Sequence, residues 1–298
     1  MLVFQSTLIA NIIDLHVCLA DYSYQHGGYQ AFSINDPKPR NIHKATVRDR
    51  LVHHAVYRVL YPSFDHVFIS DSFSCRKGKG TFKAIARFRI FGRRVSRNNT
   101  RTCWVLKGDI KKFFASIDHR ILLELLGKYL SDKGVLWLLE SIIDSFHSTG
   151  EGLGLPLGNL TSQLLVNVYL SEFDQFVKHR LRVKHYVRYA DDFLLLSESK
   201  EYLEKLLPEI SQFLKAKLRL TLNFNKVSIK TLDSGIDFLG WVHFPDHLVL
   251  RTATKRRMFK KVFGCSKLAT LTSYEGLLSH GNTFKIGQRL KKAQTLPR

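Results

Sequence analysis

The sequence predicts an α+β fold, and three observations support this prediction. Hydrophobic residues make up 45% of the 298-residue chain and aromatic residues 12%, a composition typical of globular proteins with a large core. Residues 186–196 form an apolar run on either side of two adjacent carboxylates, which is typical of two strands that meet in a hairpin. Apolar residues recur at helical spacing in residues 47–61 and 201–219, which predicts amphipathic helices there.

The two carboxylates, Asp191 and Asp192, are expected at the tip of this hairpin. A hairpin tip can present neighbouring side chains on one side, whereas a straight strand sends them to opposite faces. Flanks this apolar are expected to be buried, so the charges lie at the edge of a core, where they are costly unless paired or bound to metal. On this stretch alone, a turn that happens to contain two aspartates is an equally good explanation.

Basic residues outnumber acidic ones by 46 to 25, which gives a net charge of +21 and a pI near 9.9. A surplus of this size predicts a polyanionic partner, and nucleic acid is the main candidate. The alternative is a generally basic surface that serves solubility, but the clustering of the charge favours a binding surface. The clusters lie at residues 76–79, 87–101, 255–261 and 289–292.

The cysteines (Cys18, Cys75, Cys103 and Cys265) lie far apart and lack metal-binding spacing, so neither a disulfide framework nor a structural zinc site is expected. This pattern suits a reducing cytosol and predicts a cytoplasmic protein. Residues 1–20 lack a basic start and are interrupted by polar residues, so a buried amphipathic helix is expected there rather than a signal peptide. No apolar stretch reaches membrane-span length, and no membrane partner is expected.

Near the start of the chain the sequence predicts a basic hairpin. Residues 30–40 are typical of a strand, a turn and the start of a second strand. Pro39 keeps Lys38 out of helical conformation, so Lys38 and Arg40 alternate on one face of an extended segment. Two such cations suit the binding of a triphosphate, and a solvated basic loop explains them equally well.

The helix at residues 47–61 is expected to end at Pro62, before a short extended run at 67–70. Residues 74–81 then form a basic, glycine-rich loop that opens a helix, and the N–H groups at such a place favour anions. The spacing is not that of a P-loop, so no particular ligand follows from it. Residues 87–102 are very basic and are expected to form a surface connector.

A strand of the buried type is expected at residues 103–110, and Asp109 lies at its end. The end of a core strand is a usual place for a catalytic group, whereas a helix cap or turn residue is the ordinary explanation of such an aspartate. Further elements are expected as helices at residues 122–130, 137–146, 160–177 and 201–219, strands at 220–224 and 238–244, and basic helices from residue 252 onward.

Taken together, the strand that ends in Asp109 and the hairpin tip with Asp191 and Asp192 predict a site for a pair of Mg²⁺ ions. In phosphoryl transfer one such ion activates the attacking oxygen and the other stabilises the leaving pyrophosphate, at a separation of roughly 3.5–4 Å. Lys and Arg residues in the surrounding loops would neutralise a triphosphate.

The order of these elements resembles the reverse transcriptase family. A lone Tyr-Ala-Asp-Asp is a weak signal, but blocks in family order over residues 30–285 are a strong one. The matching blocks are residues 38–40, 48–54, 76–80, 109–114, 154–163, 189–192, 222–226 and 238–241.

The resemblance implies a right-hand polymerase fold, with a palm built on an antiparallel sheet backed by helices and with a helical thumb. Family members usually have a longer helical region before the Lys-Pro-Arg strand, so the fingers are expected to be shortened or the start of the chain to be late. The implied divisions are fingers (1–99), palm (100–118 and 153–246), a helical insertion of fingers and palm (119–152) and thumb (247–298).

The resemblance also implies roles for individual residues. Asp109, Asp191 and Asp192 would bind the catalytic metal ions, and Ile110 would join them. Lys226, in the turn after the strand at 220–224, would act as general acid for the pyrophosphate. A plain surface lysine is the ordinary alternative at that position.

For the incoming nucleotide, the resemblance implies a set of contacts from several blocks. Phe114 falls where the family keeps an aromatic gate against the ribose 2′-hydroxyl, and Gln163 falls where the templating pair is supported. A core phenylalanine is the alternative for Phe114, and a template-backbone contact is the alternative for Arg76. The implied dNTP contacts are Lys38, Arg40, Arg76, Ile110, Phe113, Phe114 and Gln163.

The activity that the resemblance implies is that of an RNA-directed DNA polymerase, which uses two Mg²⁺ ions, or Mn²⁺, to add dNTPs to a DNA or RNA primer on an RNA template. Residues 158–163 and 273–282 are similar to the enzymes of diversity-generating retroelements, which implies a small accessory protein. Antiphage-defence and group II intron-like reverse transcriptases are alternatives within the family. Outside it, the alternatives are an inactive nucleic-acid-binding relic and a DNA-templated polymerase or terminal transferase.

Overall fold

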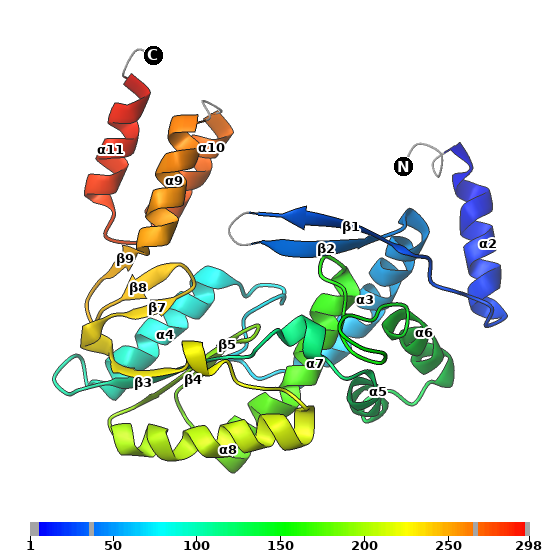
Figure 1. The fold of residues 1–298 in the computed structure, drawn as a ribbon, viewed down its shortest axis with the longest axis horizontal. Helices are drawn as coiled ribbons and strands as arrows, with labels where there is room; N and C mark the ends of the chain where they lie inside the picture. The colour runs from blue at the N-terminus through cyan, green and yellow to red at the C-terminus, as the bar shows by residue number, and fades with distance from the viewer. Residues whose placement is uncertain (1–5, 36–38, 265–267, 296–298) are drawn as a thin grey trace.

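The computed structural model describes residues 6–35, 39–264 and 268–295 and has a mixed α+β architecture (Figure 1). Its central sheet is four-stranded and antiparallel, in the order β4 (Tyr186–Tyr189), β5 (Asp192–Ser197), β3 (Trp104–Asp109) and β6 (Ser228–Thr231). Two smaller antiparallel sheets are the hairpin of β1 (Tyr29–Ile34) and β2 (Arg40–Ala45) and the three-stranded sheet of β7 (Ile236–Phe238), β8 (Trp241–His243) and β9 (Leu248–Leu250).

Helices cover both faces of the central sheet, and Figure 1 shows α8 along one face and α4 along the other. Alternate side chains of β5 therefore enter different cores: Phe193 and Leu195 join one cluster, and Leu194 and Leu196 join the other. Burial on both faces explains why β5 is a continuous apolar run. Helices α4 (Thr81–Val95) and α8 (Lys200–Leu218) contact the sheet, whereas α3 (Val47–Val67) and α5 (His119–Gly127) pack against α7 (Leu160–Gln175), and α6 (Lys133–Ile143) packs against α5.

The last helices and the first hairpin rise from opposite sides of the central part (Figure 1). Helices α9 (Thr252–Gly264), α10 (Leu268–Leu278) and α11 (Phe284–Thr295) share an apolar cluster with strands β8 and β9. Trp241 and Met258 lie at the centre of this cluster, so the C-terminal helices are anchored to the small sheet.

The prediction of a surface connector at residues 87–102 is wrong, because α4 extends to Val95. Phe88, Phe91 and Val95 recur at helical spacing and are buried against the sheet. The helical spacing of these three apolar residues was hard to recognise in the sequence because basic residues lie between them. Those basic residues lie on the solvent side of an ordinary amphipathic helix.

The predicted end of the helix at Pro62 and the predicted start of an extended run at Val67 also differ from the structure. Helix α3 continues through Pro62 to Val67, so no extended run begins there. A proline inside a helix costs about 3 kcal/mol, and burial of Phe64, which is 1% exposed, offsets part of that cost.

The predictions of one continuous strand at 220–224 and another at 238–244 are also wrong. Residues 238–244 divide into β7 and β8, because Leu239 (φ 52°) and Gly240 (φ 86°) form a tight turn between them. Around 220–224, only Leu222 pairs with the sheet, through a single bridge to Ile110. A short 3₁₀ turn, η3 (Phe224–Lys226), follows it.

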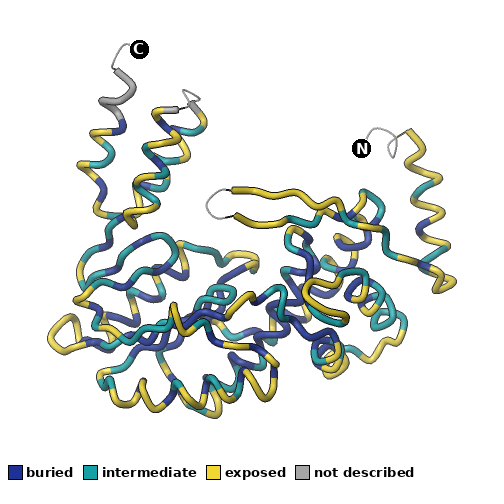
Figure 2. Tube along the Cα trace, in the orientation of Figure 1, coloured by how far each residue is buried: buried dark blue, intermediate teal, exposed yellow. Residues whose placement is uncertain are grey.

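Helix α2 (Leu8–Ala20) forms where a helix is expected, but it is not buried. Of its residues only Leu15 is buried, and Ile9 is 75% exposed. Figure 2 shows α2 standing at the edge of the molecule with most of its surface open. In the described part of the chain, no helix combines the length and the apolar character needed to span a membrane.

Gly108 allows the two central strands to meet next to the carboxylates. It lies opposite Phe193 across β3 and β5, one position before Asp109. A Cβ atom added at Gly108 would lie 2.1 Å from the tip of the Phe193 ring. That ring is fully buried and packs edge-on against Phe173, with 5.1 Å between the ring centroids, so it has no room to move aside.

We expect Gly108→Ala to lower the free energy of unfolding by about 1–3 kcal/mol, because it overpacks a filled core. Urea unfolding of the full chain measures the effect. Gly127→Ala is the matched control, since a Cβ at Gly127 meets nothing within 4 Å and lies at the end of α5. A Gly108→Ala protein as stable as the Gly127→Ala protein would contradict this account of the strand pairing.

Candidate functional site

The predicted hairpin is present, and its turn consists of Ala190 and Asp191. Tyr189 and Asp192 pair across the base of the turn, and Ala190 adopts a φ of 53°. On its other side β5 pairs with β3, where Asp192 lies directly opposite Asp109. Side chains that face each other in an antiparallel pair have Cβ atoms about 4.5–5.5 Å apart. The structure thus brings the three predicted aspartates to one end of the central sheet.

Lys226 and Asn223 hold the carboxylate of Asp109. The Lys226 ammonium lies 2.8 Å from each carboxylate oxygen, and the Asn223 amide donates to Oδ1 at 3.1 Å. The Asn223 backbone N–H also donates to the Asp109 carbonyl at 2.8 Å. The Asp109 side chain is 7% exposed and that of Lys226 is 49% exposed. A buried carboxylate is therefore neutralised by a cation that remains open to solvent.

Among the described residues the other two carboxylates have no such partner, and their pKa values are raised. Burial raises the pKa of Asp191, with the charge of Asp109 adding to the effect and those of Lys226 and Arg40 opposing it. Burial also raises the pKa of Asp192, to about 6, with the charges of Lys107 and Lys226 opposing the effect and those of Asp191 and Asp109 adding to it. Both carboxylates would be stabilised in their charged form by a further cation.

The donor set fits a hard divalent cation. Carboxylate oxygens are the ligands that Mg²⁺ prefers, and a bound cation would offset the burial that raises the pKa values of Asp191 and Asp192. In the described ranges, no group of at least three His, Cys, Asp or Glu side chains is gathered closely enough to hold a metal ion. The Lys226 ammonium lies on both oxygens of Asp109, so a metal ion at Asp109 would have to replace that contact.

Ile110, Phe113 and Phe114 follow Asp109 around a sharp bend. Ile110 as a whole is 1% exposed, and its side chain is part of the core. Phe113 and Phe114 begin the 3₁₀ turn η1 (Phe113–Ser116), with their rings edge to face. Phe113 is buried in the core, whereas Phe114 is only partly buried, and its carbonyl accepts the N–H of Leu155 at 2.8 Å. Of the two rings, Phe114 is the one available to a ligand.

The loop before α7 holds β2 in position. The Asn159 side chain donates to the His43 carbonyl at 2.8 Å and accepts the Ala45 N–H at 3.3 Å. Gly158 has a φ of 107°, and a Cβ there would lie 2.6 Å from Ile42. These contacts fix β2 against the start of α7, where Gln163 lies partly buried in the first helical turn.

The predicted triphosphate contacts have three different outcomes. Arg40 is exposed at the start of β2, and its charge acts on the pKa of Asp191, so it lies near the carboxylates. Lys38 lies outside the described residues. The Arg76 side chain is 5% exposed and donates to the Asp65 carboxylate at 2.7 Å and to the Ile69 carbonyl at 2.6 Å. These contacts hold the loop against the end of α3, so a dNTP contact by Arg76 stays a prediction.

Sequence reasoning missed Arg188 and Asp174, which form a buried ion pair under the turn. The Arg188 guanidinium donates to both carboxylate oxygens of Asp174, at 2.7 and 2.6 Å, and to the carbonyl of Ala190 at 3.1 Å. The Tyr186 hydroxyl also donates to Asp174, at 2.7 Å. An arginine in the middle of an apolar strand was the available signal, because a buried charge requires a partner.

Solved structures with a similar arrangement define the class of fold. Telomerase from Candida tropicalis superposes with a TM-score of 0.60 at 14% identity, covering 91% of this chain and 57% of that one. Telomerase from Candida albicans, solved in complex with a fragment of telomeric RNA, gives a TM-score of 0.54 at 11% identity and covers 86% and 52% of the two chains. The fold is therefore that of a right-hand polymerase, as the sequence predicted.

Residues 34–243 match the family model described as reverse transcriptase (RNA-dependent DNA polymerase), and the chain belongs to this family. Protein YkfC of Escherichia coli is 28% identical over 232 residues, 65% of this chain and 60% of its own. The group II intron-encoded protein LtrA of Lactococcus lactis is 25% identical over 295 residues, 76% and 47% respectively. The chain thus spans about half of the length of these relatives. Family membership implies the use of a divalent metal ion.

We expect Asp192→Asn to stabilise the metal-free protein at pH 8 but not at pH 4. With a folded-state pKa of about 6 against an ordinary value of 3.8, the folded chain holds a proton at Asp192 that the unfolded chain releases, so stability falls as the pH rises from about 4 to 6. The gain at pH 8 should be about 1–3 kcal/mol.

Urea unfolding in the presence of a chelator, at both pH values, measures this difference. Asp233→Asn, at an exposed carboxylate, should change stability equally little at both. If the stability gain of Asp192→Asn were the same at pH 4 and pH 8, Asp192 would not have the raised pKa on which the argument depends.

Proposed function

We propose that this chain is an RNA-directed DNA polymerase that adds dNTPs to a DNA or RNA primer on an RNA template. The observation that carries the proposal is the pairing of Asp109 with Asp192 across β3 and β5, with Asp191 in the adjoining turn. Membership of the reverse transcriptase family supports it. The net charge of +21 supports a nucleic-acid partner.

For the chemistry, we propose that Asp109, Asp191 and Asp192, with the main chain of Ile110, hold two Mg²⁺ ions, with Mn²⁺ as the alternative. When bound, such ions activate the primer 3′-oxygen and stabilise the charge on the leaving pyrophosphate. Lys226 is half exposed and its ammonium binds Asp109, so it can turn from that carboxylate toward the pyrophosphate and donate a proton.

For the nucleotide, we propose that Lys38 and Arg40 bind the triphosphate, Phe114 lies under the sugar and Gln163 supports the base pair. The proximity of Arg40 to Asp191 and the partial exposure of Phe114 and Gln163 support these roles. The division into fingers (1–99), palm (100–118 and 153–246), helical insertion (119–152) and thumb (247–298) belongs to the same proposal, as does a cytoplasmic location.

Two biological roles remain open to test. Residues 158–163 and 273–282 favour a diversity-generating retroelement with an accessory protein. The similarity to LtrA, a group II intron-encoded protein, favours a group II intron-like role. The neighbouring genes distinguish them: a template repeat beside a variable protein gene supports the first, and flanking intron sequence supports the second.

We expect Asp191→Asn to reduce primer extension on an RNA template by at least about 100-fold, since removal of one metal-binding carboxylate forfeits several kcal/mol of transition-state stabilisation. Incorporation of a single dNTP in Mg²⁺ by the full chain measures this. Asp233→Asn should keep full activity. Failure of the wild-type chain to extend any RNA or DNA primer on RNA, or equal activity of the Asp191→Asn protein, would refute the proposed function.

We expect Phe114→Ala to admit ribonucleotides, because the ring no longer blocks the 2′-hydroxyl. The preference for dNTPs over NTPs, taken as a ratio of kcat/KM values, should fall by about 10- to 200-fold. Phe284→Ala, at an exposed ring in α11, is the control and should leave the ratio unchanged. An unaltered ratio in the Phe114→Ala protein would remove Phe114 from the role of gate.

A further inference from the structure

A second basic site lies at the end of the central sheet farthest from the carboxylates. It is a cavity of about 330 Å³ between the end of α4, the segment before β4, the end of β5 and the start of α8. Its volume is within the range of small-ligand pockets. Residues from separate parts of the chain line it, so it is built by the fold rather than by one basic stretch of sequence.

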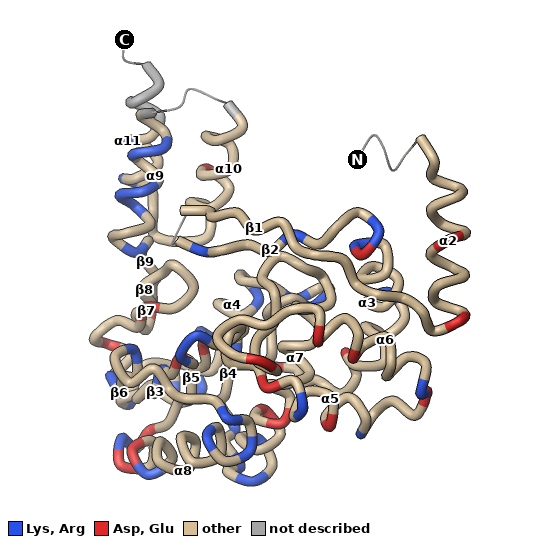
Figure 3. Tube along the Cα trace, turned by 45° about the vertical axis from the view of Figure 1, so that its right-hand side comes forward, with Lys and Arg blue, Asp and Glu red and all other residues tan. Residues whose placement is uncertain are grey.

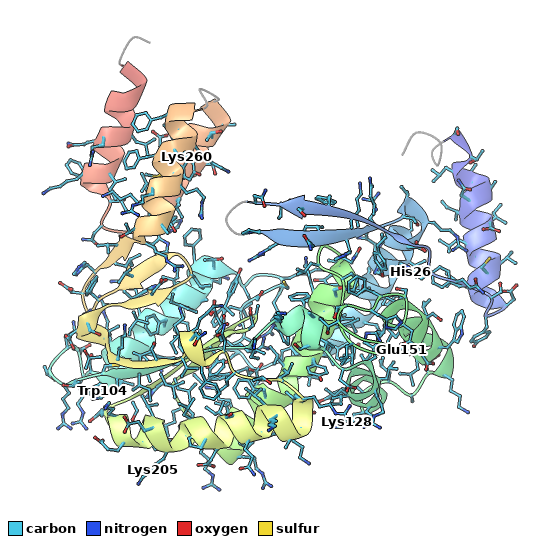
Figure 4. All side chains as sticks on the ribbon, viewed as in Figure 1. His26, Trp104, Lys128, Glu151, Lys205 and Lys260 are labelled. Atoms are coloured by element: carbon cyan, nitrogen blue, oxygen red, sulfur yellow. The ribbon has the colours of Figure 1, made fainter. Side chains whose placement is uncertain are left out.

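Strand β5 separates this pocket from the catalytic carboxylates. Asp192 begins the strand opposite Asp109, and Ser197 ends it opposite Trp104 and lines the pocket. A strand rises about 3.3 Å per residue, so the two ends lie about 17 Å apart. Figure 4 marks this end of the sheet with Trp104 and shows Lys205 on α8 beneath it. The pocket is therefore distinct from the candidate active site.

The positive charge in the pocket is not neutralised. Arg94, Arg182 and Lys184 line it, and none of them has a carboxylate partner in the portion of the chain that the structure describes. The lining carboxylate, Glu198, is shared by Arg97 at 3.5 Å and Arg101 at 3.2 Å. Figure 3 shows Lys and Arg gathered around β3, β5 and β6 and along α8. An anion would be strongly attracted here.

The pKa of His185, which also lines the pocket, is lowered in part by the same positive charges. Burial lowers its pKa, and the charges of Lys178, Arg94, Lys184 and Arg87 lower it further. Of these, Lys178 and Arg87 already share the Asp71 carboxylate, at 3.1 and 2.6 Å. Arg94 and Lys184, which contribute to this repulsion without a carboxylate of their own in the described residues, also line the pocket.

The rest of the lining is apolar and aromatic. Val95, Val183 and Leu196 are buried and form the floor, and Tyr202 on α8 is 38% exposed. A site for single-stranded nucleic acid has two parts: cations that bind the phosphate, and an exposed aromatic ring on which a base stacks. The cations continue beyond the pocket to Arg97 and Arg101, which favours a strand over a free nucleotide.

We propose that this pocket binds a phosphodiester and its unpaired base within a single-stranded nucleic acid, as a contact separate from the polymerase site. Arg94, Arg182 and Lys184 bind the phosphate, and Tyr202 stacks on the base. Binding here requires no polymerisation, so the proposal stands or falls independently of the proposed activity.

The test is photocrosslinking of the full chain to a labelled 12-nucleotide RNA that carries 4-thiouridine, in the presence of a chelator. We expect a crosslinked residue within 182–185 or 196–202, which line the pocket on either side of the hairpin that carries Asp191 and Asp192. Arg182→Gln/Lys184→Gln should lower its yield at least about fivefold and reduce the salt dependence of RNA binding by roughly 0.7 log unit per lost contact. Tyr202→Ala should also lower the yield.

Lys215→Gln/Lys217→Gln is the matched control, because it removes the same charge from exposed positions at the other end of α8, about 20 Å from Tyr202. Equal losses in the two double variants, or crosslinks only outside residues 182–185 and 196–202, would overturn the proposal. If an unlabelled abasic oligomer competed for the crosslink as well as unlabelled RNA does, the proposed contact with the base would be overturned. If free UMP competed for the crosslink as well as unlabelled RNA does, the proposal that the pocket binds a nucleic-acid strand rather than a nucleotide would be overturned. A DNA 12-mer with 4-thiodeoxyuridine shows which nucleic acid is preferred.

Discussion

The candidate site depends on a buried ion pair beneath the turn that carries Asp191. Arg188 and Asp174 are at most 1% exposed, and the Arg188 guanidinium also binds the carbonyl of Ala190. Ala190 adopts a left-handed conformation, which costs a residue other than glycine about 1–2 kcal/mol. The hydrogen bond from Arg188 offsets part of this cost and fixes the turn. Asp191 is thus held by an ion pair that it does not itself join.

Helix α7 connects this ion pair to the rest of the site. Asn167, on the same helix as Asp174, accepts from Arg188 at 3.3 Å and donates to the Ser74 carbonyl at 3.0 Å, which ties down the loop before α4. Asn159, at the start of the helix, holds β2. A buried ion pair contributes little net stability, because desolvation cancels much of the attraction. We infer that its value here is geometric: one helix aligns the turn, the loop and the hairpin.

Features set by local pattern could be predicted from the sequence, and features set by distant pairing could not. The hairpin around Asp191 and the strand ending in Asp109 follow from apolar runs and were predicted correctly. The contact of Lys226 with Asp109 depends on η3, which no periodicity signals. Helix α4 was missed because its basic residues hid the helical spacing of its buried ones, although that spacing was in the sequence.

The two ends of β5 carry opposite charges, and the distance between them keeps them independent. A net charge of +21 alone would lower carboxylate pKa values, yet those of Asp191 and Asp192 are raised. Burial sets these values, and the cations around Ser197 lie about 17 Å away along the strand, beyond the Debye length of about 8 Å. A basic surface at this distance therefore does not neutralise the carboxylates that we propose as ligands of Mg²⁺.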